Sequence, residues 1–190
     1  VGLKEAYISC KALCEAIGGK GILLWDKDAF IFPKRINGQI ALVHRILPDI
    51  QIAYAKDFSE FSDDKYWQNY LYNIQKQVLL EPQFPFEGRN IGGGCPPIPT
   101  PVGWLLIYHG VVDTPDGTIY HAGAALLDRE NPHKILGRFR VPLFSPSEPW
   151  ERAGNVNDVV FPTGAMVKGD RLYIYYGAAD TTVCKISVSE

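Results

Sequence analysis

The sequence has few of the features that mark several common protein classes. Its four cysteines, Cys10, Cys14, Cys95 and Cys184, form no Cys-x2-Cys pair, so we expect free thiols and no metal site. No apolar run approaches the roughly 20 residues needed to span a bilayer, and no signal peptide is recognisable, which predicts a cytoplasmic protein without a membrane partner. The net charge of -2 leaves no excess of Lys and Arg to bind a nucleic acid.

The composition is that of a folded chain, with 46% hydrophobic and 21% charged residues among 190. Residues 3–17 carry apolar groups at helical spacing and end at Gly18-Gly19, a suitable helix C-cap. After residue 20 the pattern changes to short alternating runs typical of β-strands. We therefore predict an atypical helical segment over residues 1–20 and a β domain over residues 21–190.

One frame occurs three times in the sequence. It reads GQIALVHR from Gly38, GWLLIYHG from Gly103 and DRLYIYYG from Asp170, and the runs QIAYAKD, AGAALLD and CKISVSE follow in the same order. Each run has the alternation of a strand, so the frame predicts a repeated β unit. Asn37-Gly38 lies between two apolar runs and predicts a two-residue hairpin, because both residues tolerate positive φ.

The segments between the repeats lead to weaker expectations. Aromatic residues at helical spacing within residues 57–80 predict a short helix or a long loop, with the aromatic stripe in the core. Residues 81–101 are rich in proline and glycine, so we expect a shaped loop outside any strand ladder, either a connection or a ligand-facing loop. A strand is expected over residues 134–143 and a long polar connection over residues 145–159.

A period of about 66 residues holding about four strands suits an all-β propeller whose blades carry long loops. Three such repeats are fewer than the four to eight blades that typically close a propeller ring. We therefore expect about three blades in this chain, and a homo-oligomer that covers their exposed edges.

Repeat-equivalent positions at strand ends are where a propeller would build a site. The frame places His44-Arg45, His109-Gly110 and Tyr176-Gly177 at matching positions, and further candidates at strand ends or turns are Lys27, Arg89, Tyr120, His121 and Asp180. Basic and aromatic side chains of these types suit an anion beside a hydroxylated ligand. Taken singly, each has an ordinary alternative: a histidine as a structural hydrogen-bonding group, an arginine in a surface ion pair.

Four stretches extend this pattern to a known family. RNIGGGCPPIPTPVGWLLIYHGV, GAALLD, NVNDVVFPTGA and YIYYGAAD resemble the mannoside phosphorylases and related mannosidases of glycoside hydrolase family 130, over about residues 22–190. The resemblance implies a five-bladed β-propeller, of which this chain would hold about three blades. It also implies a mannose-containing oligosaccharide as substrate, inorganic phosphate as co-substrate, inverting phosphorolysis and no cofactor.

The same resemblance assigns roles to single residues. It implies that Arg45, Arg89 and His109 line a phosphate site, with Lys27 and Tyr120 as further members, and that Asp180 binds a sugar hydroxyl.

The sequence also departs from the family pattern. Members carry their general acid aspartate in a Glu-Asp-Pro-Arg motif, and these 190 residues contain none. We therefore assign no catalytic residue and expect little or no phosphorylase activity from this chain alone. The alternatives are a non-catalytic carbohydrate-binding or oligomeric scaffold fragment, and a truncated product in which residues 1–20 cap an exposed blade edge.

Overall fold

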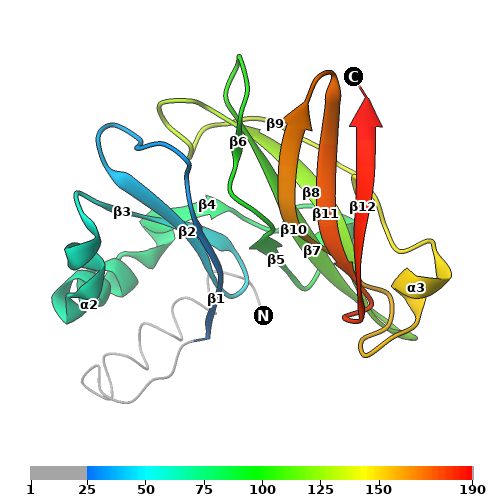
Figure 1. The fold of residues 1–190 in the computed structure, drawn as a ribbon. Helices are drawn as coiled ribbons and strands as arrows, with labels where there is room; N and C mark the ends of the chain where they lie inside the picture. Colours follow the sequence, from blue (N-terminus) through cyan, green and yellow to red (C-terminus); the bar gives the residue numbers. More distant parts are fainter. Residues whose placement is uncertain (1–24, 190) are drawn as a thin grey trace.

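The computed structural model describes residues 25–189, and within them the chain forms three antiparallel sheets with short helices in the connections between strands (Figure 1). The predicted helix over residues 3–17 and the boundary after residue 20 lie outside the described residues. Among residues 25–189, no helix is long and apolar enough to cross a membrane.

The first sheet has four strands in sequence order: β1 (Asp26–Ile31), β2 (Ile40–Ile46), β3 (Ile50–Ala55) and β4 (Val78–Leu80). Between β3 and β4 the chain forms η1 (Phe58–Ser62), α2 (Asp64–Tyr72) and η2 (Ile74–Gln77). Asp63 caps α2, and its carboxylate accepts a hydrogen bond from the Lys65 amide. The aromatic residues of α2 pack on Ile46 and Ala53 of the sheet, which confirms the core interpretation of the stripe.

The second and third sheets repeat this meander. The second contains β5 (Asn90–Gly93), β7 (Trp104–Thr114), β8 (Gly117–Leu127) and β9 (Ile135–Arg138), with the short β6 (Ile98–Pro99) also pairing with β7 and η3 (Pro85–Glu87) preceding β5. The third contains β10 (Val160–Lys168), β11 (Arg171–Ala178) and β12 (Thr182–Ser189), preceded by α3 (Pro149–Arg152).

The repeated frame corresponds to one position in each sheet. Its three copies form β2, β7 and β11, each the second strand of its sheet, and the trailing runs form β3, β8 and β12. The Asn37-Gly38 hairpin is confirmed, because φ is 48° and 80° there and Ile36 and Gln39 exchange two backbone hydrogen bonds. The predicted all-β class is confirmed, and the number of propeller blades stays a prediction.

Some local expectations were wrong. Residues 81–101 do enter a ladder, because β5 pairs with β7 from Asn90↔Val111 to Gly93↔Tyr108. Glycine weakens a strand but does not prevent it when a long partner strand supplies the hydrogen bonds. The strand expected over residues 134–143 is shorter, because only Ile135–Arg138 form β9. The connection expected over residues 145–159 does lie between β9 and β10, and it contains α3.

The sheets pack face to face around buried apolar side chains. Val43 and Ile52 of the first sheet share one cluster with Leu106 of β7, and Ile107 of β7 joins Ile174 of β11 in another. Neighbouring residues of β7 therefore face different sheets, as strand geometry requires. The central sheet is buried on both faces, so polar groups carried on β7 must find polar surroundings there.

Candidate functional site

Three charged or polar side chains meet at the end of the β1–β2 pair, against β7. Asp28 Oδ2 lies 2.8 Å from Arg45 Nε and 3.7 Å from His109 Nε2. The side chains are 10%, 14% and 1% exposed, respectively. These three residues, called the inner polar cluster below, join two sheets.

Local backbone features place Asp28 in this cluster. β1 pairs with β2 at Lys27↔Arg45 and again at Phe30↔Val43, with an irregular register between them. Asp28 lies at this irregularity with φ 56°, a left-handed conformation that aspartate tolerates better than most residues. The segment Asp26-Lys27-Asp28 belongs to β1.

Glycine in β5 provides the space for the cluster. A Cβ atom on Gly92 would lie 2.3 Å from Asp28 Oδ2 and 2.5 Å from His109 Cε1. At Gly93 it would lie 2.4 Å from the Phe30 ring. The Gly-rich stretch thus allows β1 and the His109 ring to approach the backbone of β5 closely.

His109 is held as a neutral imidazole among aromatic rings. Its ring centroid lies 4.4 Å from that of Phe161 on β10 and 6.0 Å from that of Tyr120 on β8. Burial, assisted by the positive charge of Arg45, lowers the pKa of His109 to about 3. At neutral pH the ring therefore has one N–H donor and one acceptor nitrogen.

Several buried atoms of this cluster have no hydrogen bond. Among residues 25–189, neither ring nitrogen of His109 has a hydrogen-bond partner, and the Arg45–Asp28 contact is an ion pair without hydrogen-bond geometry at Nε or Oδ2. Buried polar atoms in folded proteins are nearly always paired. Four such atoms at one place indicate a site suited to a polar ligand.

The other predicted site residues lie outside this contact network. Lys27 is the cross-strand partner of Arg45, is exposed, and places its ammonium 4.5 Å from the Trp25 ring centroid. Arg89 is half exposed and pairs with Asp113 at 3.2 Å. Asp180 lies exposed in the turn after β11, where its carbonyl accepts a hydrogen bond from Asn155.

The structure therefore brings Arg45 and His109 together, with Tyr120 beside the histidine ring, and places Lys27 at their edge. It shows no contact of Arg89 or Asp180 with these groups among residues 25–189. Sequence reasoning missed Asp28 and Phe161. Phe161-Pro162 repeats the pair Phe32-Pro33, which was the available signal for Phe161. Asp28 gave no signal, because its role depends on an unusual φ angle.

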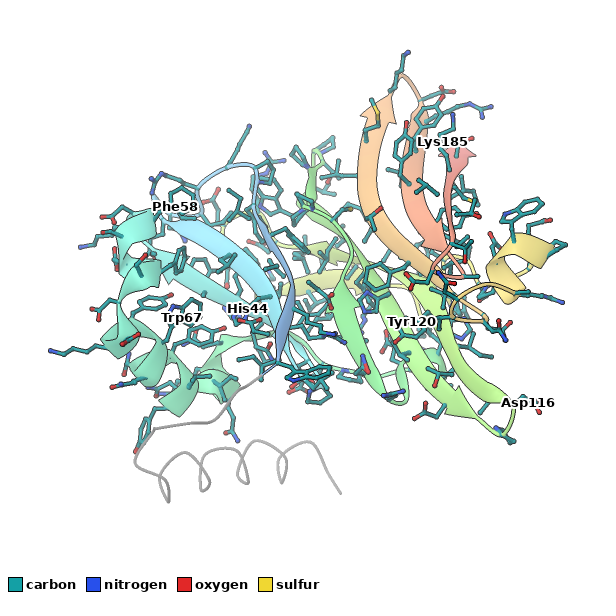
Figure 2. All side chains as sticks on the ribbon, turned by 60° about the horizontal axis from the view of Figure 1, so that its bottom comes forward. His44, Phe58, Trp67, Asp116, Tyr120 and Lys185 are labelled. Atoms are coloured by element: carbon teal, nitrogen blue, oxygen red, sulfur yellow. The ribbon has the colours of Figure 1, made fainter. Side chains whose placement is uncertain are left out.

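The matching position in the first sheet has a different role. His44 is buried, and its two ring nitrogens lie 2.9 Å from Asp26 Oδ1 and 2.6 Å from the Tyr70 hydroxyl. Figure 2 shows His44 beside Trp67 of α2, on a different sheet from Tyr120. His44 is thus a structural histidine with both nitrogens paired, whereas His109 is not. His121 likewise pairs with the Ser145 hydroxyl at 2.8 Å.

Among residues 25–189, no group of three or more His, Cys, Asp or Glu side chains is arranged to hold a metal ion. Arg45 and Lys27 carry positive charge, Asp28 carries negative charge, and His109 is neutral, an arrangement suited to an anion with several oxygen atoms.

Known proteins resemble this chain in sequence and in fold. A family model described as beta-1,4-mannooligosaccharide phosphorylase matches residues 7–190. A 1,2-beta-oligomannan phosphorylase of Thermoanaerobacter sp. (strain X514) is 40% identical over 166 residues, which cover 86% of this chain and 51% of that protein. A beta-1,2-mannobiose phosphorylase of Listeria innocua is 37% identical, with 87% of this chain and 45% of that protein covered.

Solved structures agree with these relatives. The Listeria innocua beta-1,2-mannobiose phosphorylase, in complex with beta-1,2-mannobiose, superposes with a TM-score of 0.70 at 34% identity, covering 86% of this chain and 44% of that one. The chain spans about half the length of the curated relatives it matches. Because the family match begins at residue 7 and runs to residue 190, the chain belongs to glycoside hydrolase family 130.

Proposed function

We propose that this chain provides the phosphate-binding part of a mannoside phosphorylase site. In this proposal Arg45, His109 and Lys27 bind inorganic phosphate, Tyr120 lines the same site, and Arg89 and Asp180 join it from neighbouring loops. The inner polar cluster supports the proposal, because Arg45 and the buried imidazole of His109, whose nitrogens have no hydrogen bond within residues 25–189, both lie within 4 Å of the Asp28 carboxylate. We further propose that the three sheets are blades of a propeller whose other blades lie outside this chain.

The chemistry follows from these groups. Phosphate would attack the anomeric carbon of a β-mannoside while the bond from that carbon to the leaving oxygen breaks, and the leaving oxygen takes a proton from a general acid. The products are an inverted mannosyl phosphate and a shortened sugar. Arg45 and Lys27 would hold the anion for in-line attack, and the neutral His109 would donate one hydrogen bond to it. The residues assigned here bind the nucleophile, and none of them is assigned as the acid.

Phosphate binding is the direct test of this site. We expect inorganic phosphate to raise the unfolding temperature of the purified chain, because a ligand that binds only the folded state stabilises it by about 2.7 kcal/mol at a hundredfold excess over Kd. Sodium chloride at matched ionic strength is the salt control. Isothermal titration calorimetry then gives the affinity directly.

Two arginine variants make the test specific. Arg45→Gln should remove most of the phosphate-induced shift, whereas Arg140→Gln, at an exposed arginine outside the cluster, should keep it. Baseline stability is compared first, because loss of Arg45 leaves Asp28 without its ion partner. If phosphate gives no shift in the unchanged chain, or if both variants keep it equally, the proposed site is wrong.

Turnover separates an enzyme from a binding module. The family relatives include phosphorylases named for β-1,2 and β-1,4 linkages, so both mannobioses are incubated with phosphate and the release of mannose 1-phosphate is measured. Because the Glu-Asp-Pro-Arg motif is absent from this sequence, we expect little or no product from the chain alone, in keeping with a loss of about a hundredfold to ten-thousandfold without a general acid. Rapid turnover would contradict that expectation, and mannoside binding without turnover would favour the scaffold alternative.

The assembly is tested separately. We propose that copies of the chain associate, because among residues 25–189 the strand β12 pairs on one side only, with β11. Light scattering should give a mass of at least two chains, and a monomer at all concentrations would oppose this part of the proposal.

A further inference from the structure

Asp28 is a carboxylate located where an anion is proposed to bind. Its Oδ2 atom lies between Arg45 Nε at 2.8 Å and His109 Nε2 at 3.7 Å, the two groups assigned to phosphate. A phosphate oxygen that reaches the same two groups must come close to this carboxylate. At such a distance two negative charges repel by several kcal/mol even at an effective dielectric constant of about 20.

Asp28 has little freedom to move away. Its side chain is only 10% exposed, and its backbone lies in the left-handed region with φ 56°. A change of protonation is the simpler way to remove the repulsion. Oδ2 accepts no hydrogen bond among residues 25–189, so a proton placed there disrupts none.

The electrostatic surroundings make this carboxyl easier to protonate than an exposed aspartate. Burial raises the pKa of Asp28 above its ordinary value, Asp26 acts in the same direction, and Arg45 and Lys27 oppose them. From β7 the group faces His109, and from β5 it faces glycines that carry no charge. An incoming anion adds a second negative charge beside Asp28, which raises its pKa further.

We propose that Asp28 makes anion binding at this site proton-linked: a dianion bound by Arg45 and His109 causes Asp28 to take up one proton from solvent. This inference rests on the proposed phosphate site and adds a dependence on pH to it. The proton adds to the carboxylate oxygen and no other bond changes. When Asp28 is neutral, the net charge of Lys27, Arg45 and Asp28 is +2, whereas it is +1 when Asp28 is ionised.

Sulfate is the probe that isolates this effect. Phosphate itself gains a proton near neutral pH, whereas sulfate keeps both charges, so a pH dependence of sulfate binding reports on the protein. We expect the association constant to increase as the pH falls, by at most about tenfold per pH unit, the limit for uptake of one proton. Calorimetry in two buffers of different ionisation enthalpy should show close to one proton taken up per sulfate, and this measurement needs no variant.

Asp28→Asn assigns the proton. The amide has the same shape and cannot ionise, so this variant should bind sulfate with no pH dependence and without proton uptake. Asp116→Asn, at an exposed aspartate in the β7–β8 turn (Figure 2), should behave like the unchanged chain. Thermal unfolding followed by circular dichroism confirms that both variants are folded.

Each outcome decides one point. Sulfate binding without pH dependence or proton uptake in the unchanged chain overturns the inference and leaves the anion site in place. Proton uptake that persists in Asp28→Asn also overturns it and assigns the proton to His109 instead. If neither sulfate nor phosphate binds the unchanged chain, the proposed function fails, and this inference fails with it.

Discussion

Glu87 carries the largest stability effect that we expect from one side chain. It is fully buried in η3, and its Oε1 atom accepts hydrogen bonds from the Tyr108 hydroxyl at 2.6 Å and from Arg138 Nη2 at 2.7 Å. Its Oε2 atom accepts the backbone N–H groups of Gln83 and Phe84. Four donors from three parts of the chain therefore converge on one carboxylate.

Replacing Glu87 by alanine removes the counter-ion of an arginine whose side chain is only 7% exposed. Removing one partner of a buried ion pair costs about 3–5 kcal/mol, because the remaining charge stays buried without compensation. For a chain of this size that corresponds to about 6–20 °C in unfolding temperature. Glu87→Gln keeps the shape and should fall between alanine and the unchanged chain.

Urea unfolding followed by circular dichroism measures this effect, with Glu130→Ala as the control, because Glu130 is exposed. The control should change the free energy of unfolding by less than about 0.5 kcal/mol. A loss of under about 1 kcal/mol in Glu87→Ala would refute the reasoning, since Arg138 would then have another source of compensation.

Three further predictions concern the cluster and a turn. Gly92→Ala should destabilise the chain by about 1–3 kcal/mol and abolish the phosphate-induced thermal shift, because the added Cβ meets Asp28 and His109; a folded variant with the full shift would contradict the geometry. Gly38→Ala should cost about 1–2 kcal/mol in urea unfolding through backbone strain alone, since φ is 80° and no atom lies within 4 Å of the new Cβ. As the pH is lowered from 6.5 to about 3, the free energy of unfolding should fall by up to about 1.4 kcal/mol per pH unit, because His109 takes up a proton in the unfolded chain but not in the folded one. Urea unfolding at each pH measures this dependence, and His109→Asn should show a weaker one.

The sequence predicted those elements whose signals are local. The repeated frame identified β2, β7 and β11, and Asn37-Gly38 identified a hairpin, because alternation and positive-φ residues lie within a few positions of one another. β5 was missed, because its strand conformation depends on pairing with β7, which no property of a glycine run reveals.

The residues of the candidate site also differ in whether the sequence could predict them. Arg45 and His109 could be singled out from their repeat positions and from the family resemblance, and the structure places both within 4 Å of Asp28. Asp28 itself depends on an irregular register and a left-handed φ angle, which arise only when the sheets pack. His44 holds the repeat position of His109 yet has both nitrogens paired, so repeat equivalence alone does not distinguish a site from a structural contact.

The inner polar cluster joins residues that lie more than 80 positions apart, at the meeting of two sheets, with Phe161 of a third covering the imidazole. Contacts of such high sequence separation close large loops, which makes them slow to form and late in folding. The proposed anion site should therefore form only once the sheets have packed together. A bound anion should in turn lower the rate constant of unfolding for the whole chain, because the sheets cannot separate without releasing it.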